Sequence, residues 1–482
     1  MAGIGFELKR MYAKDGLVNK IKAFTYSSLV TIGPMLTCML LVVAVQWLQL
    51  RYDVSFNDRE LFQASIVYAF IFSYIISNVL TLYLTRSVSD FIYQNKYEAI
   101  LPSFYGSLKI GLLLGAVPAL LFLGLSPLSL SYKASLLLLF MTLIVIWFEV
   151  VYLSAMKNYR RIGLSFLGGA LLSIGLSWVL LKYSDYKDAG TVLLAVDAGF
   201  MLTASALLVQ IERFFRLPAR QSDYTFLAYL TRYPSLILIG ALTALGLYSH
   251  QFVQWLGDAG VIVADAFLMS PSYDLAVYYA FMSAIPSLIM FVVSLETNLY
   301  PKYRHYYDLV LHGGSLGDIN RARGQMFQVL TQQISLLMGV QLFFSIISIA
   351  LGIRFLPLVG FSASQIELYN ILVIGFFAYI IYTVITLVLL YFDDRKGVLW
   401  LAVLFLASNT GFAVLSVLYD SQGFSFFAAA FISLLVAFGR LMHVLNHINY
   451  YTFSAQPVIH REKTNRFSKL LHAAPKQMSR LD

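Results

Sequence analysis

Long runs of apolar residues alternate along the chain with short segments that hold most of its charges. A helix needs about 20 consecutive, mainly apolar residues to cross the hydrocarbon core of a bilayer. Twelve windows of the chain meet this requirement, and we predict a helix in each. They cover residues 24–50, 61–85, 106–126, 134–156, 162–183, 190–211, 233–255, 275–299, 331–355, 367–391, 397–419 and 424–447. The pattern predicts an all-α polytopic membrane protein.

The composition agrees with this class. Hydrophobic residues make up 59% of the 482 residues and charged residues only 12%, whereas soluble domains carry about 25% charged residues. The net charge of +9 does not indicate nucleic-acid binding, because the basic residues lie at the ends of apolar windows rather than in one stripe. The single cysteine, Cys38, lies in the first window, so no intrachain disulfide is possible.

The basic residues also predict the orientation. Segments rich in Lys and Arg stay on the cytoplasmic side of a membrane. With the N-terminus inside, the cytoplasmic segments hold 28 of the 34 basic residues and the outer segments hold the other 6. We therefore predict that both termini are cytoplasmic, which requires an even number of spans.

Twelve spans divide into two halves of six, and a polar segment lies where the halves would join. The tripeptide Tyr68-Ala69-Phe70 in the second window recurs as Tyr279-Ala280-Phe281 in the eighth, which is weak evidence for a repeat. Many transporters consist of two such repeats with the pathway between them. We predict an amphipathic cytoplasmic segment (1–22), a first six-helix bundle (23–211), a cytoplasmic linker (212–232), a second six-helix bundle (233–447) and a basic cytoplasmic tail (448–482).

Several prolines interrupt the apolar windows. Gly33 and Pro34 lie together in the first window, where proline removes a backbone donor and glycine weakens the helix. We interpret this pair as a hinge; the alternative is that transmembrane helices tolerate proline. Pro118 is expected to interrupt the third span, and Pro286 is expected to break the eighth.

Polar side chains within the windows are the candidates for a transport path. A charge at the bilayer centre costs about 2.5–3.5 kcal/mol on insertion scales, so each such charge requires an explanation. Glu149 and Asp197 lie deep in their windows, Glu296 and Arg440 lie nearer the inner face, and Asn78 adds a neutral polar group. These residues are predicted to line a hydrophilic path between the halves. The alternative is that they pair with neighbours and hold helices together.

The aromatic residues include 32 tyrosines against 5 tryptophans. Most of them are expected at the membrane interfaces. Tyrosine is also suited to stacking on sugar rings while its hydroxyl forms hydrogen bonds.

No catalytic or cofactor motif is present in the sequence. It contains no P-loop pattern, and His443 and His447 lack the intervening glutamate of a zincin, so we predict no metal site and no cofactor. A membrane glycosyltransferase with Asp53 and Asp58 as catalytic acids is an alternative, but the outer loops are too short for a catalytic domain. A scaffold subunit without transport activity is a further alternative.

The opening MAGIGFELKR, followed by a basic amphipathic segment and by TIGPML in the first window, resembles the PelG family of inner-membrane exopolysaccharide transporters. The topology also resembles the wider superfamily of multidrug/oligosaccharidyl-lipid/polysaccharide exporters. The resemblance implies a bacterial transporter that moves a hexosamine-rich polymer from a cytoplasmic glycosyltransferase to the periplasm for the biofilm matrix. It also implies sibling inner-membrane subunits, one of them a cyclic di-GMP receptor.

Two other transport functions stay open. A flippase for a lipid-linked oligosaccharide must hold a pyrophosphate and should present several embedded cations, whereas Arg440 is the main candidate here. An ion-coupled multidrug exporter of the same superfamily fits the embedded acids equally well, but the N-terminal resemblance disfavours it.

Overall fold

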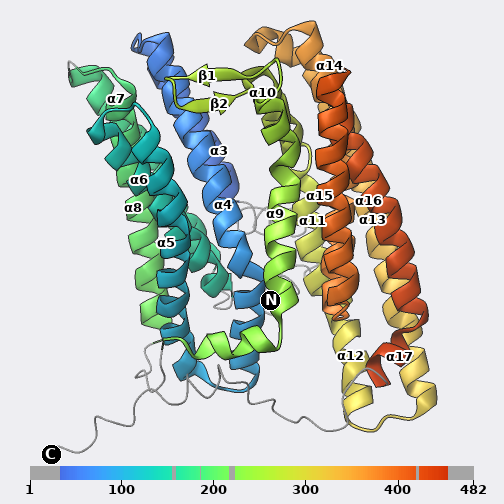
Figure 1. Cartoon of the computed structure of the whole chain (residues 1–482). Coiled ribbons are helices and arrows are strands. Elements are labelled where there is room, and N and C mark those ends of the chain that lie inside the picture. The colour runs from blue at the N-terminus through green and yellow to red at the C-terminus, as the bar shows by residue number, and fades with distance from the viewer. Residues whose placement is uncertain (1–32, 155–158, 185, 216–222, 420–422, 454–482) are drawn as a thin grey trace, which may run out of the picture.

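The structure is a computed structural model that describes residues 33–154, 159–184, 186–215, 223–419 and 423–453. Nearly all of these residues are helical (Figure 1). The first half contains α3 (Gly33–Arg51), α4 (Phe56–Tyr93), η1 (Tyr97–Ala99), α5 (Ile100–Leu125), α6 (Leu130–Ser154), α7 (Tyr159–Tyr183) and α8 (Ala189–Phe214). The predicted amphipathic segment 1–22 lies outside the described residues.

The second half follows the short helix η2 (Thr225–Thr231). Its helices are α9 (Pro234–Trp255), α10 (Pro271–Met282), α11 (Ile285–Ser294), η3 (Leu295–Leu299), α12 (Tyr300–Leu311), α13 (Leu316–Phe355), η4 (Leu356–Val359), α14 (Ala363–Tyr391), α15 (Arg395–Leu418), α16 (Phe424–Asn446) and α17 (Ile448–Phe453). Two short strands, β1 (Val261–Val263) and β2 (Phe267–Met269), form an antiparallel hairpin between α9 and α10. The predicted tail lies outside the described residues beyond Phe453.

Among the described residues, twelve helical segments are long and apolar enough to cross a membrane. This confirms the predicted number of spans and the all-α class. Many large apolar side chains face outward, such as Leu113, Leu120 and Leu121 on α5. Contact of such an apolar surface with lipid is not unfavourable, whereas its contact with water would be. The chain is therefore a multi-pass membrane protein.

The prolines behave in two ways. The eighth span is broken as expected, because α10 ends at Met282 and α11 begins at Ile285 with Pro286 in its first turn. The interruption expected at Pro118 is wrong, because α5 continues through this residue to Leu125. A single proline removes only one helical hydrogen bond, and neighbouring helices can hold the segment in line.

Other differences arise at the ends of the spans. The segment 300–330, which separates the predicted spans 275–299 and 331–355, is mostly helix, because α12 and the first turns of α13 lie within it. The segment 256–274, which separates the predicted spans 233–255 and 275–299, contains the β1–β2 hairpin, with Val261 opposite Met269 and Val263 opposite Phe267.

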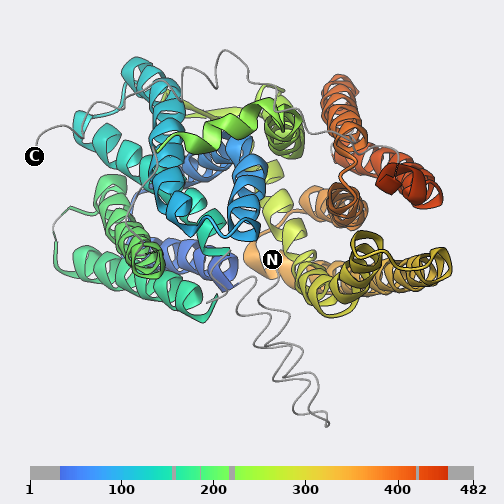
Figure 2. The ribbon, with the colours of Figure 1, turned by 90° about the horizontal axis from the view of Figure 1, so that it is seen from below.

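The helices form two groups. Helices α3–α8 pack mainly against one another, and α9–α16 do the same. Seen from below, the first group lies on the left and most of the second on the right (Figure 2). Within the first group, α7 and α8 approach closely: a Cβ at Gly199 would lie 2.3 Å from the carbonyl oxygen of Gly169. Small residues permit such close helix contacts in membranes.

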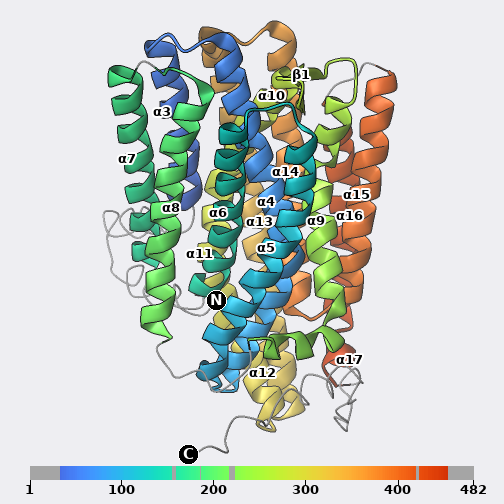
Figure 3. The ribbon, with the colours of Figure 1, turned by 60° about the vertical axis from the view of Figure 1, so that its left-hand side comes forward.

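The groups meet most extensively along α4 and α9, and we call this contact the seam. One end of the seam, the hairpin end, lies beside β1 and β2 at the top of Figure 1. At the other end, the arginine end, η2 lies across the ends of α4 and α5 (Figure 3). A second, smaller contact places Met35, Leu36 and Met39 of α3 against Ile285 and Ile289 of α11.

Candidate functional site

The seam is the candidate functional site, because it is where the two groups of helices face each other. Residues 68, 72, 83 and 86 of α4 follow helical spacings that place them along one stripe of the helix. This stripe faces α9 and its flanking segments along nearly the whole seam. Its chemistry changes from aromatic at the hairpin end to polar in the middle and cationic at the arginine end.

Aromatic rings stack across the hairpin end. The ring of Tyr68 on α4 lies parallel to that of Trp255 on α9, with ring centroids 5.1 Å apart and an interplanar angle of 7°. One turn along, Phe72 and Phe252 are 5.6 Å apart at 9°. The Tyr68 hydroxyl also donates to the carbonyl of Leu268 (2.8 Å) and accepts from its N–H (3.0 Å). The hairpin is therefore bound to α4 through its backbone.

A buried carboxylate lies on the other side of Trp255. The indole N–H donates to Asp274 at the start of α10 (2.8 Å to Oδ2). The same carboxylate accepts from Gln251 Nε2 (2.9 Å) and from the backbone N–H of Ser270 (3.3 Å). These bonds fix the plane of the indole so that one of its faces lies against Tyr68.

The middle of the seam is a close backbone approach. Asn78 donates from Nδ2 to the carbonyl oxygen of Gly240 (2.9 Å). A Cβ at Gly240 would lie only 2.2 Å from the carbonyl oxygen of Asn78. The sequence-predicted residue Asn78 therefore lies between the two groups of helices.

The arginine end gathers cations around one tyrosine. The guanidinium groups of Arg86, Arg232 and Arg395 lie 5.3, 5.3 and 4.9 Å from the centroid of the Tyr233 ring. Cations over an aromatic face are attracted by its quadrupole. Nearby, the Tyr83 hydroxyl donates to the carbonyl of Phe226 in η2.

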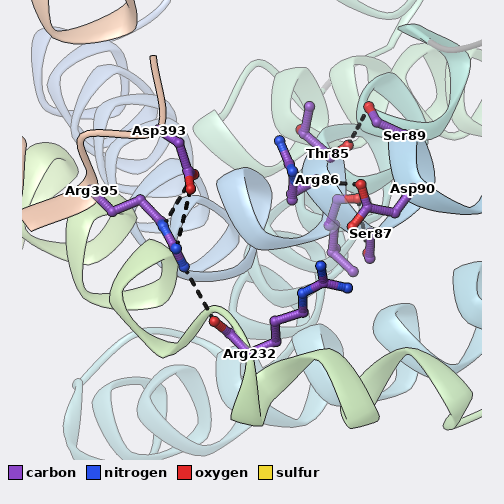
Figure 4. Close-up of polar contacts among 9 residues, drawn as sticks. Thr85, Arg86, Ser87, Ser89, Asp90, Arg232, Asp393 and Arg395 are labelled. Carbon is purple, nitrogen blue, oxygen red and sulfur yellow. Dashed lines mark hydrogen bonds and ion pairs between the residues drawn. The ribbon is translucent and has the colours of Figure 1, made fainter. Parts of the chain in front are cut away.

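Two carboxylates partly balance this charge (Figure 4). Arg86 pairs with Asp90 one turn along α4 (3.4 Å), and Arg395 pairs with Asp393 (3.1 Å). Arg395 also donates to the backbone carbonyl of Arg232 (3.2 Å). The network thus joins α4 with the start of α9 and with the turn between α14 and α15.

The deep acids predicted for the path lie inside the first group of helices. Glu149 on α6 is fully buried, and its carboxyl oxygens accept no hydrogen bond from the described residues. Asp197 on α8 is 2% exposed and accepts a hydrogen bond from Ser135 on α6. Ser135 and Glu149 are fourteen residues apart on one helix, which is about 21 Å along its axis at 1.5 Å per residue. The two acids therefore lie at different depths and do not form one cluster.

The other predicted residues are placed as follows. Arg440 makes a two-pronged pair with Asp394, from Nε to Oδ2 and from Nη2 to Oδ1, both at 2.7 Å. Asp394 also caps the first turn of α15. Glu296 belongs to η3, and its side chain is outside the described part of the structure. Gly33 and Pro34 are the first two described residues of α3, so the segment before the predicted hinge is not described.

The aromatic rings of the seam were not among the predicted site residues. Their signal is present in the sequence, because Tyr68 and Phe72 on one helix and Phe252 and Trp255 on the other have helical spacing. A pattern of apolar residues does not distinguish such rings from ordinary core or interface aromatics, since both follow the same periodicity.

Helices arranged in two groups in this way form a fold that the chain shares with solved structures of membrane transporters. Solved structures with this fold are membrane transporters of the MOP superfamily. One is a MOP superfamily transporter from Pyrococcus furiosus, with 13% identity, 89% of this chain and 96% of that chain covered, and a TM-score of 0.56. Another is the Vibrio cholerae MATE transporter VcmN in its bent form, with 13% identity, 93% and 99% covered, and a TM-score of 0.57. A third is a multidrug resistance MATE family transporter in an outward-facing conformation, with 12% identity, 88% and 96% covered, and a TM-score of 0.60.

The sequence specifies the family within this class. The profile of the PelG exopolysaccharide exporter family (EPS-E) matches residues 1–453. The chain belongs to the PelG family and is a membrane exporter. No curated protein matches its sequence.

Proposed function

We propose that the protein exports a hexosamine-rich, Pel-like exopolysaccharide from the cytoplasm to the periplasm, along a path that opens at the seam. The match of the PelG family to residues 1–453 is the observation that carries this proposal. The seam supports it, because aromatic and polar side chains face each other there beside aliphatic ones such as Ile71, whereas a permanent helix interface could be aliphatic throughout. Polar and aromatic groups suit the hydroxyls and the apolar faces of a sugar chain.

The orientation follows from the charges. Arg86, Arg232 and Arg395 belong to basic segments that the positive-inside rule assigns to the cytoplasm. The arginine end is then cytoplasmic and the hairpin end periplasmic, in the bacterial inner membrane. In this orientation a cytoplasmic glycosyltransferase delivers the polymer at the arginine end. Sibling membrane subunits, including a cyclic di-GMP receptor, complete the export complex that supplies the biofilm matrix.

The sequence-predicted transport residues remain part of the proposal. Asn78 lies on the seam, and Glu149 and Asp197 act from within the first group by changing how its helices pack as the path opens. The Gly33-Pro34 pair serves as the bend that lets α3 follow this movement.

A lipid-linked oligosaccharide is the second candidate substrate. The observation in its favour is the group of three guanidiniums around Tyr233. Arginine is the preferred partner of phosphate groups because it donates two parallel hydrogen bonds. Asp90 and Asp393 already pair with two of these arginines, which favours the polysaccharide.

The test is to delete the gene in a producing strain and to measure where carbohydrate accumulates. The proposal expects polymer inside the cell, little polymer outside, and restoration by the full-length chain. Accumulation of a lipid-extractable saccharide would favour the flippase. Unchanged secretion, or the absence of any polymer in all fractions, would contradict an export function.

A further inference from the structure

We propose that the stacked rings at the hairpin end, Tyr68 with Trp255 and Phe72 with Phe252, form a binding site for the sugar units of the exported polymer. This inference rests on the proposed function and assigns it a substrate-binding site. In the structure the rings cover each other. When the seam opens, a pyranose ring takes the place of the partner ring on each exposed face.

The geometry of these pairs sets them apart. Among the aromatic pairs of the described residues, only these two have rings parallel to within 10°, and both cross the seam. The Tyr74–Tyr248 pair farther along the seam is T-shaped at 79°. A parallel pair that separates uncovers two flat faces, whereas a T-shaped pair uncovers one face and one edge.

Flat aromatic faces match the apolar face of a sugar. A pyranose ring carries axial C–H bonds on its faces, and their hydrogens bear partial positive charge. The face of an aromatic ring is negative because of its quadrupole. Stacking is therefore favourable for any pyranose and does not require a particular sequence of sugars, as a polymer exporter needs.

Polar groups for the hydroxyls lie beside the rings. Asp274 and Gln251 are joined to each other and to the edge of Trp255. The backbone N–H and carbonyl of Leu268 are occupied by Tyr68 in the closed seam and become free when Tyr68 moves away. A rigid indole with a carboxylate, an amide and backbone groups at its rim is a preorganised arrangement for a polyol.

Two of the four rings, those of Phe252 and Trp255, belong to a small apolar cluster and not to the main core. Ile71, Ile75, Ala244 and Trp255 form a small apolar cluster, against which Tyr68, Phe72 and Phe252 pack. Tyr68 and Phe72 also pack against the large hydrophobic cluster, which includes residues of both groups of helices. Opening the hairpin end therefore separates Tyr68 from Trp255 and Phe72 from Phe252, while Tyr68 keeps its contact with Phe122 of α5 in the first group.

The test measures binding of N-acetylhexosamine tetramers to the purified full-length chain in lipid nanodiscs by titration calorimetry. Phe252→Leu removes a ring that makes no hydrogen bond in the structure, and Trp255→Leu removes the central ring. Each substitution should weaken binding about twofold to twelvefold, because one aromatic stack is worth about 0.5–1.5 kcal/mol and about 1.4 kcal/mol corresponds to a factor of ten. Trp400→Leu is the matched control, since Trp400 is 75% exposed on α15, and it should bind like the wild type.

Tyr68→Phe separates stacking from the hairpin contact. It keeps the ring but loses both hydrogen bonds to Leu268, so it should retain saccharide binding, whereas Tyr68→Leu should lose it. Gel filtration shows whether each variant is folded. Equal binding by the wild type, Phe252→Leu and Trp255→Leu would overturn the site, and so would no binding by the wild type. Either result leaves the export function intact if deletion still traps polymer in the cell, whereas unchanged secretion after deletion would overturn the function itself.

Discussion

The close approach of α4 and α9 makes a quantitative prediction about Gly240. The Cβ of an alanine here would lie 2.2 Å from the carbonyl oxygen of Asn78, while ordinary contact begins near 3.4 Å, so the helices must separate by 1.2 Å. Overpacking of this kind costs about 1–3 kcal/mol. The bond from Asn78 to the carbonyl of residue 240 is also weakened or lost, at about 1 kcal/mol. Because alanine is the better helix former by about 1 kcal/mol, we expect a net loss of about 2 kcal/mol in the free energy of unfolding.

The matched control is Gly411→Ala on α15. Nothing lies within 4 Å of a Cβ at Gly411, so only the helix propensity changes, and the free energy of unfolding should rise by about 1 kcal/mol. Denaturant titrations of both variants in detergent micelles, followed by circular dichroism, should therefore differ by about 3 kcal/mol. Export should fall only in Gly240→Ala. Equal stability of the two variants would show that the backbones of α4 and α9 do not meet at this point.

Three further predictions concern Glu149, the Gly33-Pro34 pair and Asp394, the partner of Arg440. Asp394→Ala should lower the free energy of unfolding by about 2 kcal/mol, because the helix cap and the half-buried pair with Arg440 contribute about 1 kcal/mol each. Asp394→Asn keeps a capping side chain, so it should lose only about half of this in the same titration. Equal losses in the two variants would contradict the role of the cap. Glu149→Gln should not lower stability, because the carboxyl has no hydrogen-bond partner to lose, yet it should impair secretion at normal abundance in the membrane; normal secretion would remove Glu149 from the mechanism. Replacing Gly33 and Pro34 together by alanine should slow export, and an unchanged rate of export would reduce the pair to tolerated helix chemistry.

The spans could be predicted from the sequence because the bilayer imposes a minimum apolar length. The same criterion misses the part of a helix that extends beyond the lipid. Helix α13 begins at Leu316, fifteen residues before the predicted span, because its first turns are charged and start from a Ser315 cap that accepts from Asp318 N–H. Hydropathy does not detect such an extension, whereas the capping pattern of serine and aspartate three residues apart indicates it.

The hairpin shows what local pattern could not provide. Its turn places Ala264 and Asp265 in the left-handed region, at φ of 49° and 50°. Hairpin turns of this kind are normally recognised by glycine or asparagine, and neither is present between Val263 and Phe267. The contact of the hairpin with Tyr68, two hundred residues away, could not be predicted from a local sequence pattern either.

The sequence indicated which polar residues lie within the spans, but not which of them lie at the candidate site. The search for polar residues within the apolar windows identified Asn78, which lies on the seam. It also identified Arg440 on α16, whose partner Asp394 lies in the turn between α14 and α15. An intramembrane charge reports that a special environment exists, but not whether that environment is a path or a paired contact. Only the packing of the helices separates these cases.

The contacts at the hairpin end and in the middle of the seam are strong enough to close it there and weak enough to be exchanged. Two stacked ring pairs, the two hydrogen bonds of Tyr68 and the one of Asn78 contribute about 5 kcal/mol together, at about 1 kcal/mol each. Shifting a two-state equilibrium from almost fully closed to almost fully open takes about 5.5 kcal/mol of differential binding. In the proposed function, a sugar chain that stacks on the four uncovered ring faces and bonds the two freed backbone groups of Leu268 supplies about 6 kcal/mol, at about 1 kcal/mol each. The proposed polymer would thus open the hairpin end by binding to it, and the seam would close again once the polymer has left.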